Sequence, residues 1–476
     1  MNVYVPPISL ESTPWGAERV RQFRIIPRLE AYPAVVSFAQ TVAGKLVLLT
    51  LFGAGMTYFV KDWFVLSLCL ALITFIPSRR RLLVTISTLI FTFAVPWRSF
   101  PLKSYTVSMI VLCIALGGMF FWSAVRFPRS WYGRRPVFVL LSSYSVLILA
   151  ASSVPQDWTL WGPVWLFVHF FSIYVWFIAY SLLDHNAADR DPFKFQLGSY
   201  LPFWGSTTTP FAKGAAYLRR IEAKDGKQLA ITQLKAVKLL SWALLLFWFG
   251  HWFDYCIYQY LRIPPFQTAL ALSVQRTPLP WYVCWASLIA GFFGGIISLC
   301  VTGHSIIAGC RMAGFNALRN TYRPLSSRTV AEFFNRYYFY FKELLVDFFF
   351  YPFFLRYFKK NRKVRLVAAI FAAACFGNAF FHFGRDLIFI ERLGLIGALV
   401  NYQVYLFYCV VLATGISISQ LRHRNPAPAG FIRGQLLPSA LVVFFFCLLD
   451  VFGSTERNYP LSEHFRFLSH LFNLNL

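Results

Sequence analysis

The residues best suited to chemistry in this chain are the few ionisable side chains that interrupt its long apolar runs. Such a group is costly to bury in an apolar segment and is therefore a functional candidate by default. His382 follows the run from Phe376 to Phe381, where a neutral imidazole could act as a general base near neutral pH. A hydrogen-bonded core histidine is the competing interpretation. The other residues of this kind are Lys45, His169, His251, Asp254, Glu343 and Asp347.

Other catalytic and metal-binding signatures are missing from the sequence. It contains no HExxH, GxSxG, GxxxxGK[ST] or GxGxxG motif, and no histidine has a second one three or four positions away. The nine cysteines occur singly, without a CxxC pair, which is typical of packed small hydrophobic residues. We therefore expect neither a metal site nor a bound cofactor.

The composition predicts that these residues are carried by a membrane protein. Of the 476 residues, 58% are hydrophobic and only 13% are charged, whereas soluble proteins carry about 25% charged residues. The formal net charge of +26 comes from 45 Lys and Arg against 19 Asp and Glu. This charge is spread over separate loops between apolar segments. It predicts contact with membrane lipids and argues against nucleic acid as a partner.

Apolar segments long enough to cross a bilayer predict an all-α, polytopic protein with about 11 transmembrane helices. Basic residues follow every second segment, which predicts a cytoplasmic N-terminus and a C-terminus outside. The segment 1–33 is polar and is expected to be cytoplasmic or interfacial. The predicted spans are 34–60, 63–77, 82–97, 106–125, 136–154, 160–183, 236–258, 281–301, 364–383, 396–419 and 434–452.

Two of the basic loops, 184–235 and 302–363, are long yet rich in aromatic residues. Irregular backbone lies at membrane depth only where it is buried in protein or lines a wet cavity. We therefore expect both loops to form re-entrant or membrane-embedded elements. They place the candidate site in a core of 184–395, between transmembrane helices in 34–183 and those in 396–476.

The order of residues after 302 is more specific and resembles the membrane-bound O-acyltransferase (MBOAT) family. The similarity is greatest to its bacterial branch of alginate O-acetylation and teichoic-acid D-alanylation proteins, and it covers about 195–390. A stretch from Leu201 to Pro210 and Arg219-Arg220 resembles a further family segment. The residues that carry the resemblance are Thr302-Gly303-His304-Ser305, Gly314-Phe315-Asn316, Tyr322-Arg323-Pro324, Ser326, Val330 to Tyr338, Asp347-Phe348, Tyr351-Pro352 and Phe381-His382-Phe383.

The chain departs from the family pattern at several of these positions. Tyr338 stands where the family has its first histidine, and Ile306 replaces an aspartate. Val346 replaces an arginine, while Phe381 and Phe383 replace the tryptophan and glycine beside the second histidine. That second histidine, taken as catalytic in the family, is retained as His382.

The resemblance implies a reaction and roles for the site residues. His382 would be the general base on an acceptor hydroxyl, and Tyr338 would hold either the imidazole or the thioester carbonyl. The donor would be an acyl thioester, either acyl-CoA or an acyl carrier protein, and the acceptor an exported polymer or lipid of the cell envelope. The implied location is a bacterial plasma (inner) membrane. Substrate-binding residues on this reading are Asn335, Arg336, Asn378, His304 and Asp347.

Two other classes of function remain open from the sequence. A catalytically degenerate MBOAT-like protein could serve as a structural or assembly subunit of a membrane complex with a cell-envelope partner, and the altered motif residues favour it. A transporter or channel for a small or lipid-like molecule is the third class. That class often shows internal repeats with paired broken helices, and the sequence shows no internal symmetry.

Overall fold

The computed structural model describes residues 25–99, 103–187, 190–205, 213–422, 430–453 and 459–474. Most of the predicted segment 1–33 therefore lies outside the described residues, as does Pro210 of the family-like stretch. All regular structure in the described part is helical, and an isolated antiparallel bridge joins Glu222 to Phe315. The expectation of an all-α protein is confirmed for this part of the chain.

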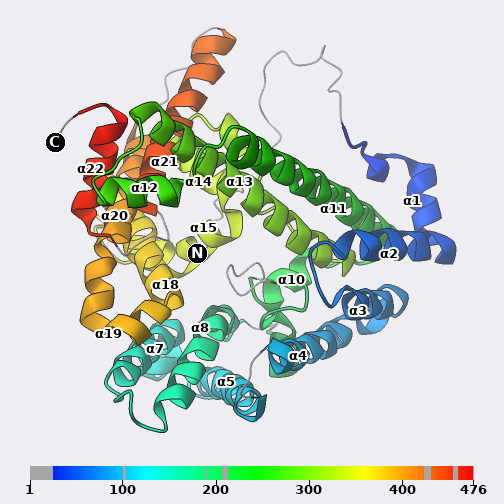
Figure 1. Cartoon of the computed structure of the whole chain (residues 1–476). Helices are drawn as coiled ribbons and strands as arrows, with labels where there is room; N and C mark the ends of the chain where they lie inside the picture. Colours follow the sequence, from blue (N-terminus) through cyan, green and yellow to red (C-terminus); the bar gives the residue numbers. More distant parts are fainter. Residues whose placement is uncertain are drawn as a thin grey trace.

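The α-helices follow one another along the whole described chain. Figure 1 shows α11 and α13 as two long neighbouring helices, with α1 to α4 on one flank and α19 to α22 on another. The bounds are α1 Pro33–Gln40, α2 Val42–Met56, α3 Trp63–Phe75, α4 Arg80–Ser99, α5 Lys103–Arg126, α6 Trp131–Arg134, α7 Pro136–Ser152, α8 Trp161–Leu183, α9 Phe193–Gln196, α10 Ala215–Ile221, α11 Gly226–Asp254, α12 Phe266–Val274, α13 Trp281–Met312, α14 Val330–Tyr337, α15 Phe339–Leu345, α16 Tyr351–Phe354, α17 Arg362–Ile370, α18 Asn378–Arg385, α19 Ile388–Asn401, α20 Gln403–Leu421, α21 Leu437–Gly453 and α22 Leu461–Leu471.

In the part of the chain that the structure describes, eight short helices of other types connect or extend these elements. Four are 3₁₀ turns: η1 Leu29–Ala31, η2 Pro77–Arg79, η3 Leu197–Ser199 and η5 Pro324–Ser326. Four are π-helices continuous with an α-helix: η4 Tyr255–Tyr260, η6 Val346–Phe350, η7 Phe371–Gly377 and η8 Ile432–Leu436. The π-helices are notable because such segments are rare and occur frequently at functional sites.

Seven described helices are long and apolar enough to cross a membrane, or nine if each of two bent pairs is one span. The structure thus supports an integral membrane protein but does not confirm the predicted count of eleven. The seven are Tyr105–Arg126, Trp161–Leu183, Gly226–Tyr260, Trp281–Met312, Arg362–Arg385, Gln403–Leu421 and Ile432–Gly453.

The difference in count has two sources. The predicted span 136–154 is α7, an apolar helix shorter than the seven spans, and elsewhere the chain bends inside apolar sequence. The predicted span 34–60 turns by 93° at Thr41, whose extended backbone ends α1 and whose hydroxyl caps α2 by accepting from the Gly44 N–H. The predicted spans 63–77 and 82–97 form one pair bent by 105°, because Pro77 starts a new turn. Apolar composition does not reveal these bends.

Contacts link the five basic segments that follow every second predicted span, which are 78–81, 126–135, 184–235, 302–363 and 420–433, the last through the neighbouring Gln435. The guanidinium of Arg80, after α3, donates to the carbonyl of Ala223, and the N–H of Ala223 donates to the carbonyl of Gly314. The further links are Arg81 with Asp191, His185 with the Gly133 carbonyl, and Gln435 with the Ser326 carbonyl. The side of the membrane that these segments face remains a prediction.

Candidate active site

The candidate base His382 lies on α18, directly after the π-helix η7. At Gly377, the last residue of η7, an added Cβ would lie 2.6 Å from the ring of Phe349 on η6. Real Cβ contacts are longer than this, so only glycine allows the two π-helices to approach so closely. The glycine thereby brings the segment that carries Asp347 against the helix that carries His382.

The imidazole of His382 is half-buried among aromatic rings. Its centroid lies 4.7 Å from that of Tyr405 on α20, 5.6 Å from Phe341 on α15 and 5.3 Å from Phe381. The Tyr405 hydroxyl donates to the side-chain oxygen of Asn378 at 3.2 Å, one turn before the histidine. Tyr405 therefore supports both the predicted histidine and the predicted asparagine.

The second predicted catalytic residue, Tyr338, approaches the same region from the junction of α14 and α15. Its ring centroid lies 5.9 Å from that of Phe341, the ring that also contacts His382. Burial raises the pKa of the Tyr338 phenol, and the nearby Arg385 on α18 opposes that shift. Tyr338 is therefore a neutral hydrogen-bonding group at physiological pH, unsuited to act as a base.

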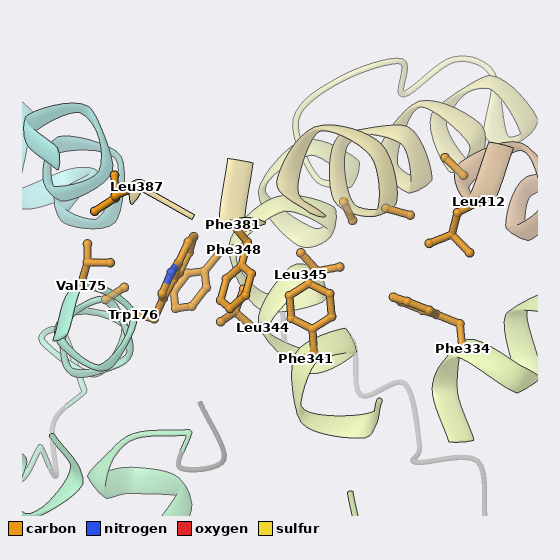
Figure 2. Packing of buried hydrophobic residues seen from close by; sticks show 14 of the residues in the cluster. Val175, Trp176, Phe334, Phe341, Leu344, Leu345, Phe348, Phe381, Leu387 and Leu412 are labelled. Carbon is orange, nitrogen blue, oxygen red and sulfur yellow. The ribbon is translucent and has the colours of Figure 1, made fainter. Parts of the chain in front are cut away.

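Buried aromatic packing surrounds this pair of residues. Phe341 and Phe381 are 6% and 4% exposed, and their centroids lie 4.8 Å apart. Figure 2 shows both in a row of apolar side chains that runs from Trp176 on α8 to Phe334 on α14. A small hollow beside α18 and α19 is lined by Phe383, Asp386, Phe389, Ala398, Asn401 and Tyr402.

Three other predicted substrate-binding residues have different surroundings. Arg336 on α14 forms an ion pair with Glu332 at 2.6 Å and donates to the Ser326 hydroxyl at 2.7 Å. Asn335, its neighbour on the same helix, is half-buried. His304 on α13 is buried, and its Nδ1 donates to the carbonyl of Cys300 at 2.5 Å. For Arg336 and His304, the contacts are with their own segments and not with His382.

The seventh predicted residue, Asp347, belongs to a charged network that sequence reasoning did not assemble. The Lys213 ammonium lies 2.9 Å from Asp347 and 2.6 Å from Glu343, and Glu343 also pairs with Lys342. Burial raises the pKa of Asp347 against the attraction of Lys213, whereas Lys342 and Lys213 outweigh burial at Glu343 and lower its pKa. Lys213 does not belong to a recognisable sequence motif. In the sequence it is only an isolated lysine that precedes a short helix.

This network belongs to a seam between the two long loops that were expected to be embedded. The Tyr217 hydroxyl on α10 lies 3.3 Å from that of Tyr340 on α15. Asn316 donates its N–H to the carbonyl of Ile221, beside the bridge from Glu222 to Phe315. The two loops therefore form one folded unit, although their depth in a membrane remains a prediction.

The described residues contain no group of three or more His, Cys, Asp or Glu side chains arranged to hold a metal ion. No protein-family model matches the chain, and no curated protein matches it. The MBOAT resemblance therefore depends on the motif residues given above.

Proposed function

We propose that this protein is a membrane-bound O-acyltransferase of the MBOAT type. It would move an acyl group from a cytoplasmic thioester, acyl-CoA or an acyl carrier protein, to a hydroxyl of an exported polymer or lipid. The proposed setting is a bacterial plasma membrane, with a cytoplasmic N-terminus and a C-terminus outside.

The observation that carries the proposal is the convergence of two motif positions on one ring. Tyr338, at the junction of α14 and α15, and His382, on α18, are far apart in the sequence, yet both contact Phe341. The motif order is the reason for choosing these two residues. Asn378 and Tyr405 add hydrogen-bonding groups beside the imidazole.

The proposed reaction uses the chain's own residues for proton transfer and orientation. A neutral ring nitrogen of His382 accepts the proton of the acceptor hydroxyl while that oxygen attacks the thioester carbonyl carbon. The carbon–sulfur bond breaks, and the leaving thiolate takes the proton back from the imidazolium. The neutral Tyr338 phenol would donate a hydrogen bond to the carbonyl oxygen, where negative charge develops.

The test is transfer of label from radioactive acetyl-CoA into the lipid and polymer fractions of membranes that contain the protein. His382→Gln should lower the rate by about 100-fold or more, the usual contribution of a general base. The matched control is His251→Gln, because His251 is exposed and its Nδ1 bonds the Phe247 carbonyl within its own helix. Equal rates in the His382 variant and the wild type would exclude the proposed base.

One observation favours a second candidate, a catalytically degenerate subunit of a membrane complex. Phe341 and Phe381 are buried directly against the His382 ring, where an acyl chain would need room. On this reading the wild type would transfer no label, and His382→Gln would change stability or co-purification of a cell-envelope protein instead.

A further inference from the structure

A short helical hairpin, residues 351–365, carries a dense positive charge. It consists of α16, the turn 355–361 and the first residues of α17. Six cations lie within its last ten residues, and the sequence has no acidic residue between Asp347 and Asp386. The hairpin therefore has a formal charge of +6. The six cations are Arg356, Lys359, Lys360, Arg362, Lys363 and Arg365.

Folding does not supply the missing acids. Among the residues that the structure describes, no ion pair involves any of the six cations. Five of the six are exposed, and the half-buried Arg365 has its guanidinium carbon 4.3 Å from the ring centroid of Phe354. A ring face attracts a cation but does not neutralise its charge.

Local contacts give the hairpin a defined shape. The ring centroid of Phe353 lies 4.7 Å from that of Tyr357 and 6.2 Å from that of Phe358. The Asn361 side chain caps α17 by accepting from the Lys363 N–H at 3.1 Å. The Asn361 N–H in turn donates to the carbonyl of Phe358 at 3.2 Å. The cations therefore belong to a folded element and not to a loose loop.

Large apolar side chains are exposed beside these cations. Leu355, Tyr357 and Phe358 are 61%, 53% and 54% exposed, and they alternate in the sequence with Arg356 and Lys359. Aromatic and basic side chains occur together at the level of lipid headgroups, where one part of the surface is apolar and the other is wet. A small anion in water would match the cations but would leave the apolar side chains exposed.

The position of the hairpin in the fold is that of a juxtamembrane segment. The candidate membrane span Arg362–Arg385 begins with α17, so the turn 355–361 lies directly before it. The hairpin also belongs to the basic segment 302–363, which is predicted to face the cytoplasm. Four to eight Lys and Arg residues immediately cytoplasmic of a transmembrane helix are typical of contact with anionic lipids.

We propose that the 351–365 hairpin is a binding site for the headgroups of anionic phospholipids. The cations attract the lipid phosphates, while Leu355 and Phe358 contact the boundary between headgroups and acyl chains. Contact with membrane lipids was expected from the charge of the whole chain. This site specifies the segment and the class of lipid, and it does not depend on acyl transfer.

The test measures thermal stabilisation of the full-length protein in mixed micelles of a non-ionic detergent and lipid. Phosphatidylglycerol is titrated against phosphatidylcholine, and inorganic pyrophosphate is titrated separately as a soluble anion. We expect phosphatidylglycerol to raise the unfolding midpoint more than either of the others. Equal stabilisation by the two lipids, or stabilisation by pyrophosphate as large as that by phosphatidylglycerol, would overturn the proposal.

Charge variants make the test specific to the hairpin. A triple variant with Lys359→Gln, Lys360→Gln and Lys363→Gln should bind phosphatidylglycerol about 100-fold more weakly, because each cation near an anionic surface contributes about fivefold. The control triple variant removes the same charge from exposed lysines of three separate segments and should lose less than about threefold. Its changes are Lys61→Gln, Lys194→Gln and Lys227→Gln. Equal losses in the two triple variants would show that the hairpin is not the site.

A variant without a charge change tests the apolar part of the contact. Leu355→Ser leaves all six cations in place and removes an exposed apolar side chain, so folding should be unaffected. It should weaken phosphatidylglycerol about threefold and leave the response to pyrophosphate unchanged. An unchanged affinity for phosphatidylglycerol would reject a lipid as the ligand.

Discussion

Replacing Lys213 by methionine should destabilise the protein strongly, because the change leaves two half-buried carboxylates facing each other. The ammonium lies 2.6 Å from Glu343 and 2.9 Å from Asp347, and the three side chains are 13%, 23% and 21% exposed. Removing one partner of a buried ion pair costs about 3–5 kcal/mol. We expect a loss near the lower limit, at about 3 kcal/mol, because the two carboxylates are partly exposed and Glu343 keeps a second cation, Lys342.

The assay is the midpoint of thermal unfolding in detergent, followed by intrinsic fluorescence. With an unfolding entropy of roughly 2.1 cal/mol/K per residue over 476 residues, 3 kcal/mol corresponds to about 3 °C. Lys227→Met is the matched control, since it removes the same charge from an exposed position at the start of α11. We expect the control to stay within about 0.5 kcal/mol of the wild type.

The pH dependence of this loss follows from the two carboxyl pKa values. The lowered pKa of Glu343 gives stability that is present above its unfolded pKa and lost as pH falls through the folded one. The raised pKa of Asp347 gives stability that is present at low pH and lost as pH rises through its folded pKa. Without Lys213, both pKa values should rise.

The deficit of the Lys213 variant should therefore be largest near about pH 7–8 and shrink towards about pH 5, where the carboxyls bind protons. Adding Glu343→Gln and Asp347→Asn to the variant should recover most of the loss, because the two facing carboxylates are removed and Lys342 is the only charge of the network that is left. A deficit equal to that of Lys227→Met, or one that does not change with pH, would refute the reasoning.

Three further changes test other contacts of the fold. Glu222→Gln should cost about 3 kcal/mol, because the Arg80 guanidinium is 3% exposed and loses its carboxylate; a thermal midpoint equal to the wild type would contradict this. Gly377→Ala should cost about 1–3 kcal/mol by forcing the Phe349 ring away, as measured by unfolding in denaturant, and no loss would mean that η6 and η7 are loosely packed. Tyr405→Phe should cost about 1 kcal/mol through one lost hydrogen bond, and labelled acyl transfer should fall while protein levels in membranes stay constant.

Much of the fold could be predicted because it depends on local properties of the chain. Apolar runs such as 281–301 correspond to helices, and α13 extends this run to Met312. The number of spans was less predictable, because bends at Thr41 and Pro77 change the path without changing the apolar composition. The hydropathy of a segment indicates whether it can lie in an apolar environment, but it does not predict the angle between that segment and the next helix.

The candidate site was predictable in part. Motif order selected His382 and Tyr338, and the structure brings both to Phe341. It gives Arg336 and His304 partners within their own segments instead. A motif specifies residue type and order, whereas the direction of each side chain depends on the packing of helices that are distant in the sequence.

The sequence by itself determined that this is a helical protein with apolar segments suited to a membrane, since composition and the length of the apolar runs are enough for that conclusion. It also determined that the positive charge is divided among separate segments. Only the tertiary structure decided that these segments meet, that Lys213 pairs with Glu343 and Asp347, and that Lys238 pairs with Glu30. The physical reason is that the electrostatic energy of a charged side chain depends on the charges close to it. In this protein folding brings those charges together from residues that are far apart in the sequence.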